Sequence, residues 1–184
     1  MCSQFILKIK PQHLAIKYNI LIPEGLDDID ARYLPYQTAS VIAANPFKEY
    51  KLQLSPMSFS LIPYWSKESR VKFATHNARI ETVLEKPTWK NPFLTKHCLI
   101  PMTGFYEAVY QGPEAGHIIK FASEVGSPLF AAGIYDLWKD PNDHSKKIFS
   151  FAILTTPPSS FISDPGHDRT PLFLDFNNSK PWLE

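Results

Sequence analysis

The chain contains little cysteine, little glycine and no long hydrophobic run. Two cysteines in 184 residues are too few for a secreted disulfide framework, so a reducing, cytoplasmic setting is expected. No apolar stretch reaches membrane-spanning length, and the N-terminal sequence lacks a signal-peptide cleavage region. Only 7 glycines stand against 17 prolines, which favours short elements joined by rigid turns. A membrane partner is therefore not expected.

An excess of either charge and a metal-ligand pattern are also missing. The 19 Lys and Arg residues nearly balance the 18 Asp and Glu residues, giving a formal net charge of +1. A nucleic-acid site would therefore have to be a local concentration of cations. The histidines and cysteines show no C-x-x-C or H-E-x-x-H spacing, and no glycine loop is present that would cradle a phosphate. We expect no metal and no cofactor.

What the chain does contain is a series of short apolar stretches bounded by turn residues. Its length suits a single domain, expected to span residues 2–184 after removal of Met1. The stretches are rich in aromatic and β-branched residues, which is typical of strands. They predict an α+β fold with a β-rich core, a curled, barrel-like and mainly antiparallel sheet, and a few short helices. The predicted strands lie at residues 58–65, 98–102, 117–122, 129–138, 147–155 and 170–176.

Helices are expected in three places. Apolar residues recur at helical spacing between residues 78 and 86, with Asn77 in the position of an N-cap and Pro87 ending the run. Shorter helices are expected at residues 28–33 and 158–162.

Cys2 is the candidate nucleophile, because it follows the initiating methionine and has a small side chain. Loss of Met1 would leave an α-amine and a thiol on one residue. An α-amine has a pKa of about 7.7–8.0, so part of it is neutral and nucleophilic at cellular pH. The amine condenses with an aldehyde to a Schiff base, and the thiol can then close a five-membered thiazolidine ring. The alternative is an ordinary small residue near the chain end.

Glu107 and His167 are candidates for proton transfer. Alternation in residues 101–108 places Glu107 on the same side of a strand as Phe105, where desolvation raises the pKa of a carboxyl group. His167 follows a Pro-Gly turn and precedes a predicted strand, and histidine titrates near neutral pH. The alternatives are a salt-bridged Glu107 at a strand end and a His167 bonded to local backbone.

Cations and aromatic side chains nearby predict contacts with single-stranded nucleic acid. Arg79, in the first turn of the expected helix, and Arg169 are placed to bind phosphate. Phe59 and Trp65 can stack unpaired bases beside such cations. The alternatives are core packing for each aromatic residue and an ion pair with Asp168 for Arg169.

Five motifs along the chain occur together in one known family. They are Met1-Cys2, FSLIPYW at residues 59–65, NARIET at 77–82, CLIPMTGFYE at 98–107 and HDRTP at 167–171. In this order, and over nearly the whole chain, they resemble the SRAP family of SOS response-associated peptidases, also called abasic site processing proteins.

The resemblance implies a β-rich, monomeric protein without metal that binds single-stranded DNA containing abasic sites, in the cytoplasm or on the nucleoid. It implies that Cys2 forms a thiazolidine crosslink with the ring-opened abasic sugar after autocatalytic release of Met1. The remaining implied roles are Asn77 holding the N-terminus or the sugar, Glu107 and His167 transferring protons, and Arg79 contacting phosphate.

This chain departs from the family pattern at three positions, two within those motifs and one just after Met1-Cys2. Gln4 stands where the family has arginine, and it lacks the guanidinium fork that suits a phosphate. Phe59 replaces a tryptophan, and Thr170 replaces a methionine.

Two other functions stay open from the sequence. One is a cysteine-nucleophile peptidase acting on other polypeptides, with the Cys2 thiol and His167 as base. The other is a module that binds single-stranded DNA without covalent chemistry.

Overall fold

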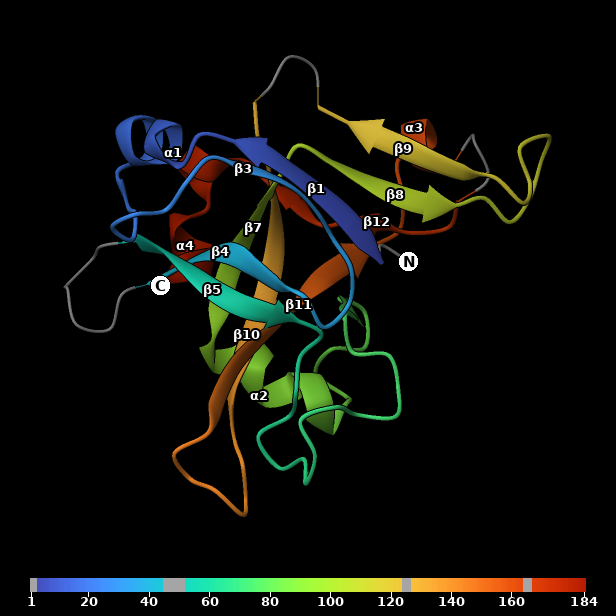
Figure 1. The fold of residues 1–184 in the computed structure, drawn as a ribbon. Helices are drawn as coiled ribbons and strands as arrows, with labels where there is room; N and C mark the ends of the chain where they lie inside the picture. Colours follow the sequence, from blue (N-terminus) through green and yellow to red (C-terminus); the bar gives the residue numbers. More distant parts are fainter. Residues whose placement is uncertain (1–2, 45–51, 124–126, 164–166) are drawn as a thin grey trace.

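A computed structural model describes residues 3–44, 52–123, 127–163 and 167–184. Within these ranges, five strands form a closed ring of hydrogen-bonded neighbours (Figure 1). They are β4 (Thr38–Ala44), β5 (Leu52–Phe59), β7 (His97–Met102), β10 (Leu129–Lys139) and β11 (Lys147–Thr156). Antiparallel pairs run from β11 through β10, β7 and β4 to β5, and β5 then pairs with β11 in parallel. The predicted fold class, β-rich with a barrel-like and mainly antiparallel sheet, is confirmed.

A second sheet, of four strands in the described part of the chain, lies above this ring in Figure 1. Its strands are, in spatial order, β3 (Ile29–Tyr33), β1 (Gln4–Ile9), β8 (Gly104–Ala108) and β9 (Ile118–Ala122). Phe5 and Phe105 lie opposite each other on its inner face, and both are buried. The ring of Phe5 lies 5.3 Å from that of Phe59 on the barrel, edge to face. Aromatic packing of this kind joins the two sheets.

Shorter elements complete the described structure. Two-residue strands β2 (Ile20–Leu21), β12 (Thr170–Pro171) and β13 (Phe173–Leu174) pair with β5, β11 and β10, and β6 (Asn77–Arg79) pairs with β11 in parallel. The helices are α1 (Pro11–Tyr18), α2 (Pro87–Thr95), α3 (Ser160–Ser163), α4 (Lys180–Leu183) and the 3₁₀ turn η2 (Phe176–Asn178).

Most strand predictions agree with the structure. The stretches 98–102, 117–122, 129–138 and 147–155 coincide with β7, β9, β10 and β11. The stretch 58–65 was wrong beyond Phe59, because Ser60 has a φ of 109° and turns the chain out of β5. The stretch 170–176 is divided into β12 and β13.

The principal helix prediction was wrong. Residues 77–79 form β6, whose backbone bonds to β11, and turns follow it up to the start of α2. Asn77 is therefore not an N-cap. Residues 28–33 also lie largely in a strand, β3, and the helix expected at 158–162 is realised as α3, shifted toward its C-terminal end. Two helices that were not predicted, α1 and α2, both begin with proline, which is favoured at the first helical position.

Among the described residues, no helix is both long enough and apolar enough to cross a bilayer.

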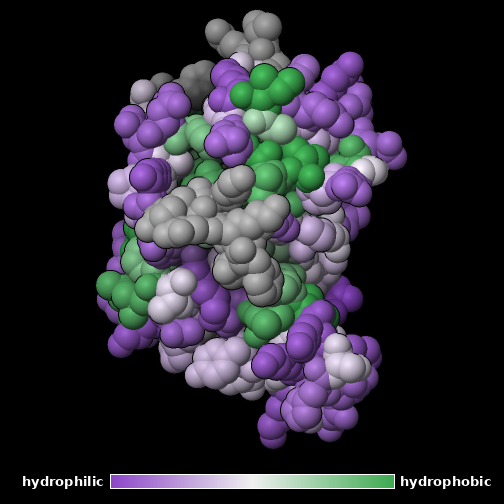
Figure 2. Space-filling view, turned by 90° about the vertical axis from the view of Figure 1, so that its left-hand side faces the viewer, coloured by the Kyte–Doolittle hydropathy of each residue, from purple (hydrophilic) through white to green (hydrophobic). Residues whose placement is uncertain are grey.

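One face of the molecule carries a band of hydrophobic side chains. Figure 2 faces the side on which α1 lies, and there hydrophobic side chains form a band bordered by hydrophilic ones. Strand β1 begins near the N-terminus, on the right-hand side of Figure 1, and runs toward the side of α1.

Candidate functional site

Glu107 and His167 form a buried pair at the end of β8. The Nε2 atom of His167 lies 3.1 Å from Oε2 of Glu107, and the two side chains are 0% and 1% exposed. Strand alternation produces this arrangement, because Glu107 follows the exposed-side Tyr106 and shares the inner face with Phe105. His167 comes from the segment that precedes β12 and meets Glu107 only in the tertiary structure.

The protonation of the pair follows from its neighbours. His167 donates from Nδ1 to the carbonyl oxygen of Ala108 at 2.9 Å, which fixes the hydrogen on Nδ1 because a carbonyl can only accept. Burial raises the pKa of Glu107 to about 7, and burial also lowers the pKa of His167 below its ordinary 6.5. Both shifts favour neutral groups. In the state with both groups neutral, Oε2 of Glu107 donates its proton to Nε2 of His167.

The start of β1 lies beside this pair. Gln4 is opposite Tyr106 in the β1–β8 register, and Tyr106 immediately precedes Glu107. Oε1 of Gln4 accepts hydrogen bonds from Arg32, one of them from Nε at 2.8 Å. Cys2, the predicted nucleophile, lies outside the described residues.

Asn77 and Arg79 lie on β6 rather than on a helix. Asn77 is 9% exposed and pairs with Ile153 of β11, whereas Arg79 is exposed and pairs with Thr155. The helix N-terminus that was expected to attract a phosphate beside Arg79 does not exist. The exposed guanidinium of Arg79 remains as a group that can bind a phosphate at this position.

Arg169 is directed into the protein. It is 7% exposed and donates from Nη1 and Nη2 to the two carboxylate oxygens of Glu81, at 2.8 and 3.0 Å. Nη2 also donates to the carbonyl oxygen of Thr155 at 2.7 Å. The expected alternative partner, Asp168, is exposed. The positive charge of Arg169 is thus balanced by Glu81. The sequence contains no signal for this pair, whose members are 88 residues apart.

The two aromatic candidates have different environments. Phe59 is 0% exposed and stacks on Phe151 with ring centroids 5.2 Å apart, so its role is core packing. Trp65 is 48% exposed and lines a shallow hollow of about 470 Å³ together with Arg70 and Lys72. Of the two, only Trp65 offers a ring face to a base.

The segment that carries Trp65 is fixed by hydrogen bonds to side chains of β10. The backbone N–H of Tyr64 donates to Oδ2 of the buried Asp136 at 3.2 Å, and Nε1 of Trp138 donates to the carbonyl oxygen of Ser66 at 2.8 Å. Lys96 neutralises Asp136 at 2.7 Å. The exposed Tyr64 and Trp65 rings therefore stand on a fixed backbone, which lowers the entropy cost of stacking on them.

Sequence reasoning passed over His76, which adjoins β6. Its ring meets that of Phe59 edge to face with centroids 5.9 Å apart, and burial lowers its pKa. Its position directly before the NARIET motif was the signal that could have identified it.

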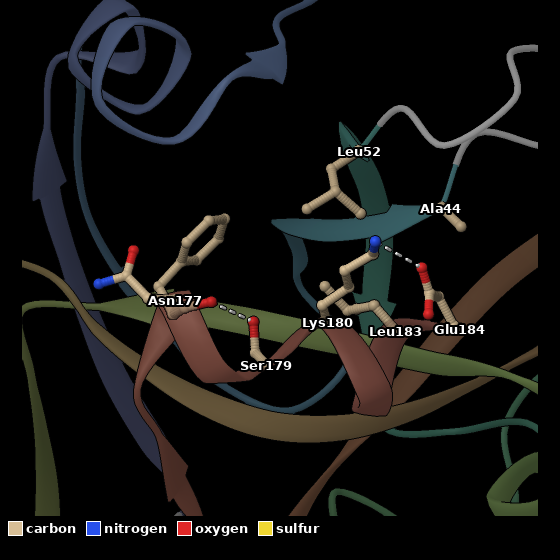
Figure 3. A pocket seen from close by; sticks show the side chains of 8 residues that line it. Ala44, Leu52, Asn177, Ser179, Lys180, Leu183 and Glu184 are labelled. Atoms are coloured by element: carbon tan, nitrogen blue, oxygen red, sulfur yellow. Dashed lines mark hydrogen bonds and ion pairs between the residues drawn. The ribbon is translucent and has the colours of Figure 1, made fainter.

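A larger hollow of about 660 Å³ lies elsewhere, beside α4 (Figure 3). Leu52 and Leu183 line it, and its cation, Lys180, pairs with Glu184 at 3.4 Å. It contains no residue of the Glu107–His167 pair.

Comparisons with known proteins agree with these features. The model of the family described as SOS response associated peptidase (SRAP) matches residues 1–184. The abasic site processing protein YoqW of Bacillus subtilis (strain 168) is 31% identical over 186 residues, covering 100% of this chain and 80% of YoqW. YoaM of the same organism, also named an abasic site processing protein, is 35% identical over 188 residues, covering 100% of this chain and 79% of YoaM.

A more distant relative is the abasic site processing protein HMCES of Gallus gallus. It is 30% identical over 153 residues, covering 71% of this chain and 45% of HMCES. A crystal structure of a Bacteroides thetaiotaomicron protein shares the fold with a TM-score of 0.78 at 24% identity, covering 100% of this chain and 81% of that one. By its full-length match to the family model, this chain belongs to the SOS response associated peptidase (SRAP) family.

Proposed function

We propose that this protein binds single-stranded DNA and captures abasic sites by a covalent bond to Cys2. Family membership supports the substrate, because YoqW, YoaM and HMCES are named abasic site processing proteins. The observation that carries the chemistry is the buried contact of Glu107 with His167 at 3.1 Å, beside the strand that follows Cys2. Burial there raises the pKa of Glu107 to about 7.

Chain connectivity keeps Cys2 close to this pair. Cys2 is two residues before Gln4, and two residues span at most about 7 Å. Gln4 pairs with Tyr106, the neighbour of Glu107. The proposal therefore requires Cys2 to reach Glu107 from the start of β1, a distance that two residues of chain can span.

The reaction has two bond-forming steps once Met1 is removed. The α-amine of Cys2 adds to the aldehyde carbon of the ring-opened sugar, and loss of one water gives an imine. The thiol then adds to the imine carbon, and its proton passes to the nitrogen, closing a thiazolidine ring. Because both nucleophiles belong to one residue, the second step is intramolecular and fast.

Glu107 and His167 supply the proton transfers that these steps need. A carboxyl group with a pKa of about 7 can protonate the departing hydroxyl of the carbinolamine and recover the proton afterwards. His167 keeps Oε2 oriented and accepts or returns the proton through Nε2. Release of Met1 is part of the same proposal, with this pair assisting peptide hydrolysis.

DNA contacts are proposed for exposed groups around the site. Arg79 binds a phosphate, and Trp65 stacks on an unpaired base. Asn77, largely buried on β6, holds the sugar or the new N-terminus. Arg169 and Phe59 act indirectly, because both are buried.

The test is denaturing gel electrophoresis and intact mass after mixing the protein with a single-stranded oligonucleotide that carries one abasic site. We expect a heat-stable adduct whose mass is that of the protein without Met1 plus the oligonucleotide, less one water. Cys2→Ala should form no heat-stable adduct. Cys98→Ala is the matched control, since it removes a fully buried thiol and should leave the adduct unchanged.

Borohydride reduction distinguishes the role of the Cys2 α-amine from that of the Cys2 thiol. Cys2→Ala keeps the α-amine, so reduction should trap it as an imine although no thiazolidine can form. A heat-stable adduct in Cys2→Ala without reduction would refute the mechanism. Salt-sensitive DNA binding without any adduct, in protein that has lost Met1, would instead support the noncovalent module.

A further inference from the structure

Arg32 of β3 is held in an unusual setting on the exposed face of the four-stranded sheet. Its guanidinium lies over the ring of Tyr106, 4.2 Å from the centroid, and its Nε donates to Oε1 of Gln4 at 2.8 Å. Strand register explains the meeting, because Arg32 is opposite Ile6, which shares its face of β1 with Gln4, and Gln4 is opposite Tyr106. One arginine thus bridges three neighbouring strands.

The partners of Arg32 fix its position without cancelling its charge. By contrast, Lys8 of the same sheet pairs with Asp30 at 2.6 Å, and Arg169 elsewhere in the protein pairs with Glu81. Tyr106 and Gln4 are neutral, and none of the carboxylates in the described ranges forms an ion pair with Arg32. A guanidinium that is ordered but not neutralised is prepared for an anion.

A second cation extends this surface. Lys120 of β9 is exposed and lies opposite Tyr106, on the same face of the sheet. It too has no ion-pair partner among the residues that the structure describes. Arg32 and Lys120 therefore flank Tyr106 with two uncompensated positive charges.

The location of this surface relates it to the candidate site. Gln4 and Tyr106 belong to the exposed face of the β1–β8 pair, and Glu107 belongs to the opposite face of the same strand end. Cys2 precedes Gln4 by two residues. A DNA strand held covalently at Cys2 would pass this end of the sheet, where Arg32 is exposed.

We propose that Arg32, seated on Tyr106 and Gln4, binds a backbone phosphate of single-stranded DNA next to the captured sugar. Guanidinium recognises phosphate through paired N–H donors, and Arg32 is exposed on this face of the sheet. The assignment rests on the proposed function for its biological meaning, but phosphate binding by Arg32 can be measured independently of the covalent step.

The experiment measures binding of a fluorescent oligothymidylate without any abasic site across a range of salt concentrations. Each phosphate contact contributes about 0.7 to the slope of log affinity against log salt for single strands. Arg32→Ala should reduce the slope by about that amount and weaken binding about tenfold at low salt. Lys17→Ala, which removes one positive charge from α1, should change neither quantity.

Arg32→Lys keeps the positive charge but removes the planar guanidinium group with its paired N–H donors. It should keep most of the slope but recover only part of the affinity, because a lysine cannot stack on Tyr106 and donate in pairs. Unchanged melting temperatures for both variants would show that the exposed edge strand is intact.

The outcomes separate this inference from the proposed function. If wild-type protein forms the covalent adduct but Arg32→Ala leaves both slope and affinity unchanged, the phosphate assignment is overturned and the proposed function stands. If wild-type protein forms no adduct while Arg32→Ala reduces the slope, the phosphate site stands and the covalent mechanism fails.

Discussion

The guanidinium of Arg169 donates to both carboxylate oxygens of Glu81, at 2.8 and 3.0 Å, and this pair joins two segments that are 88 residues apart in the chain. Arg169 is two residues from His167, and Glu81 is two residues from Arg79. The contact therefore ties the segment that supplies the site histidine to the segment that supplies β6. Arg169 is buried and bonded within the protein, so it holds these two segments together.

Removing Glu81 should destabilise the protein. Glu81→Ala leaves the buried guanidinium of Arg169 with only its bonds to Thr155, and we expect the free energy of unfolding to fall by about 2 kcal/mol. Urea denaturation with an unchanged m-value would measure it. Glu114→Ala, which breaks an exposed pair with His117, is the control and should cost less than about 0.5 kcal/mol. Equal effects of the two variants would contradict a structural role for Glu81.

The same pair should contribute to acid sensitivity. Hydrogen bonding from Arg169 holds the pKa of Glu81 below its ordinary 4.5. The unfolded chain then binds more protons than the native protein just below that value, so the contribution is complete above about pH 4.5 and is lost as the pH falls through the lowered pKa. The stability difference between wild type and Glu81→Gln should therefore shrink from about pH 6 to about pH 3. A difference that stays constant over this range would be inconsistent with an ionised pair.

Glu107 should determine the alkaline side of the crosslinking rate profile. Its pKa of about 7 means that it loses its proton as the pH rises through neutrality, whereas the α-amine becomes reactive near about pH 7.7–8.0. The wild-type rate should pass through a maximum at about pH 7.4, midway between the two pKa values. Glu107→Gln should be slower by about 100-fold and should keep rising to about pH 8, as expected when only the amine titrates.

Single-turnover crosslinking rates measured across pH would test this profile. An unchanged maximum in Glu107→Gln would assign the alkaline limb to a different group. His167→Gln provides a second check, because it removes the imidazole beside Oε2 and should shift the alkaline limb without abolishing it.

Trp65 should contribute to DNA affinity without affecting the chemistry. Trp65→Ala is expected to weaken binding of single-stranded DNA by about 1–3 kcal/mol, the range for one stacked base, and to leave the crosslinking rate at saturating DNA unchanged. Phe149 is the matched control, since it is 47% exposed against 48% for Trp65 and lies on β11. Fluorescence anisotropy would measure the DNA affinities of Trp65→Ala and Phe149→Ala. Equal affinities for these two variants would contradict a DNA contact by Trp65.

The strands of the barrel were predictable because local sequence dominates their formation. β10 and β11 are long apolar runs that are buried along most of their length, and no competing helical spacing occurs in them. β1 and β3 show the same alternation, at Phe5 and Leu7 and at Ile29 and Ala31. Nevertheless no strand is predicted at β1 and a helix is predicted at residues 28–33, where the two-residue alternation is the correct signal.

The helix expected at residues 78–86 shows the limit of local reasoning. Ile80, Val83 and Leu84 repeat at helical spacing. The segment nevertheless begins as strand β6, because its backbone pairs with β11. That pairing joins residues more than 70 positions apart, and nothing local to the segment indicates it. Tertiary hydrogen bonds overrode a weak helical preference.

The sequence by itself determined the family, the β-rich class and the burial of Glu107 beside Phe105, because each depends on residue order or on two-residue alternation. Only the tertiary structure decided which groups meet. It placed His167 against Glu107, turned Arg169 inward to Glu81, buried Phe59, and set Arg32 over Tyr106. These contacts join residues that are distant in the chain, and their geometry follows from strand register and sheet packing, which no single segment specifies.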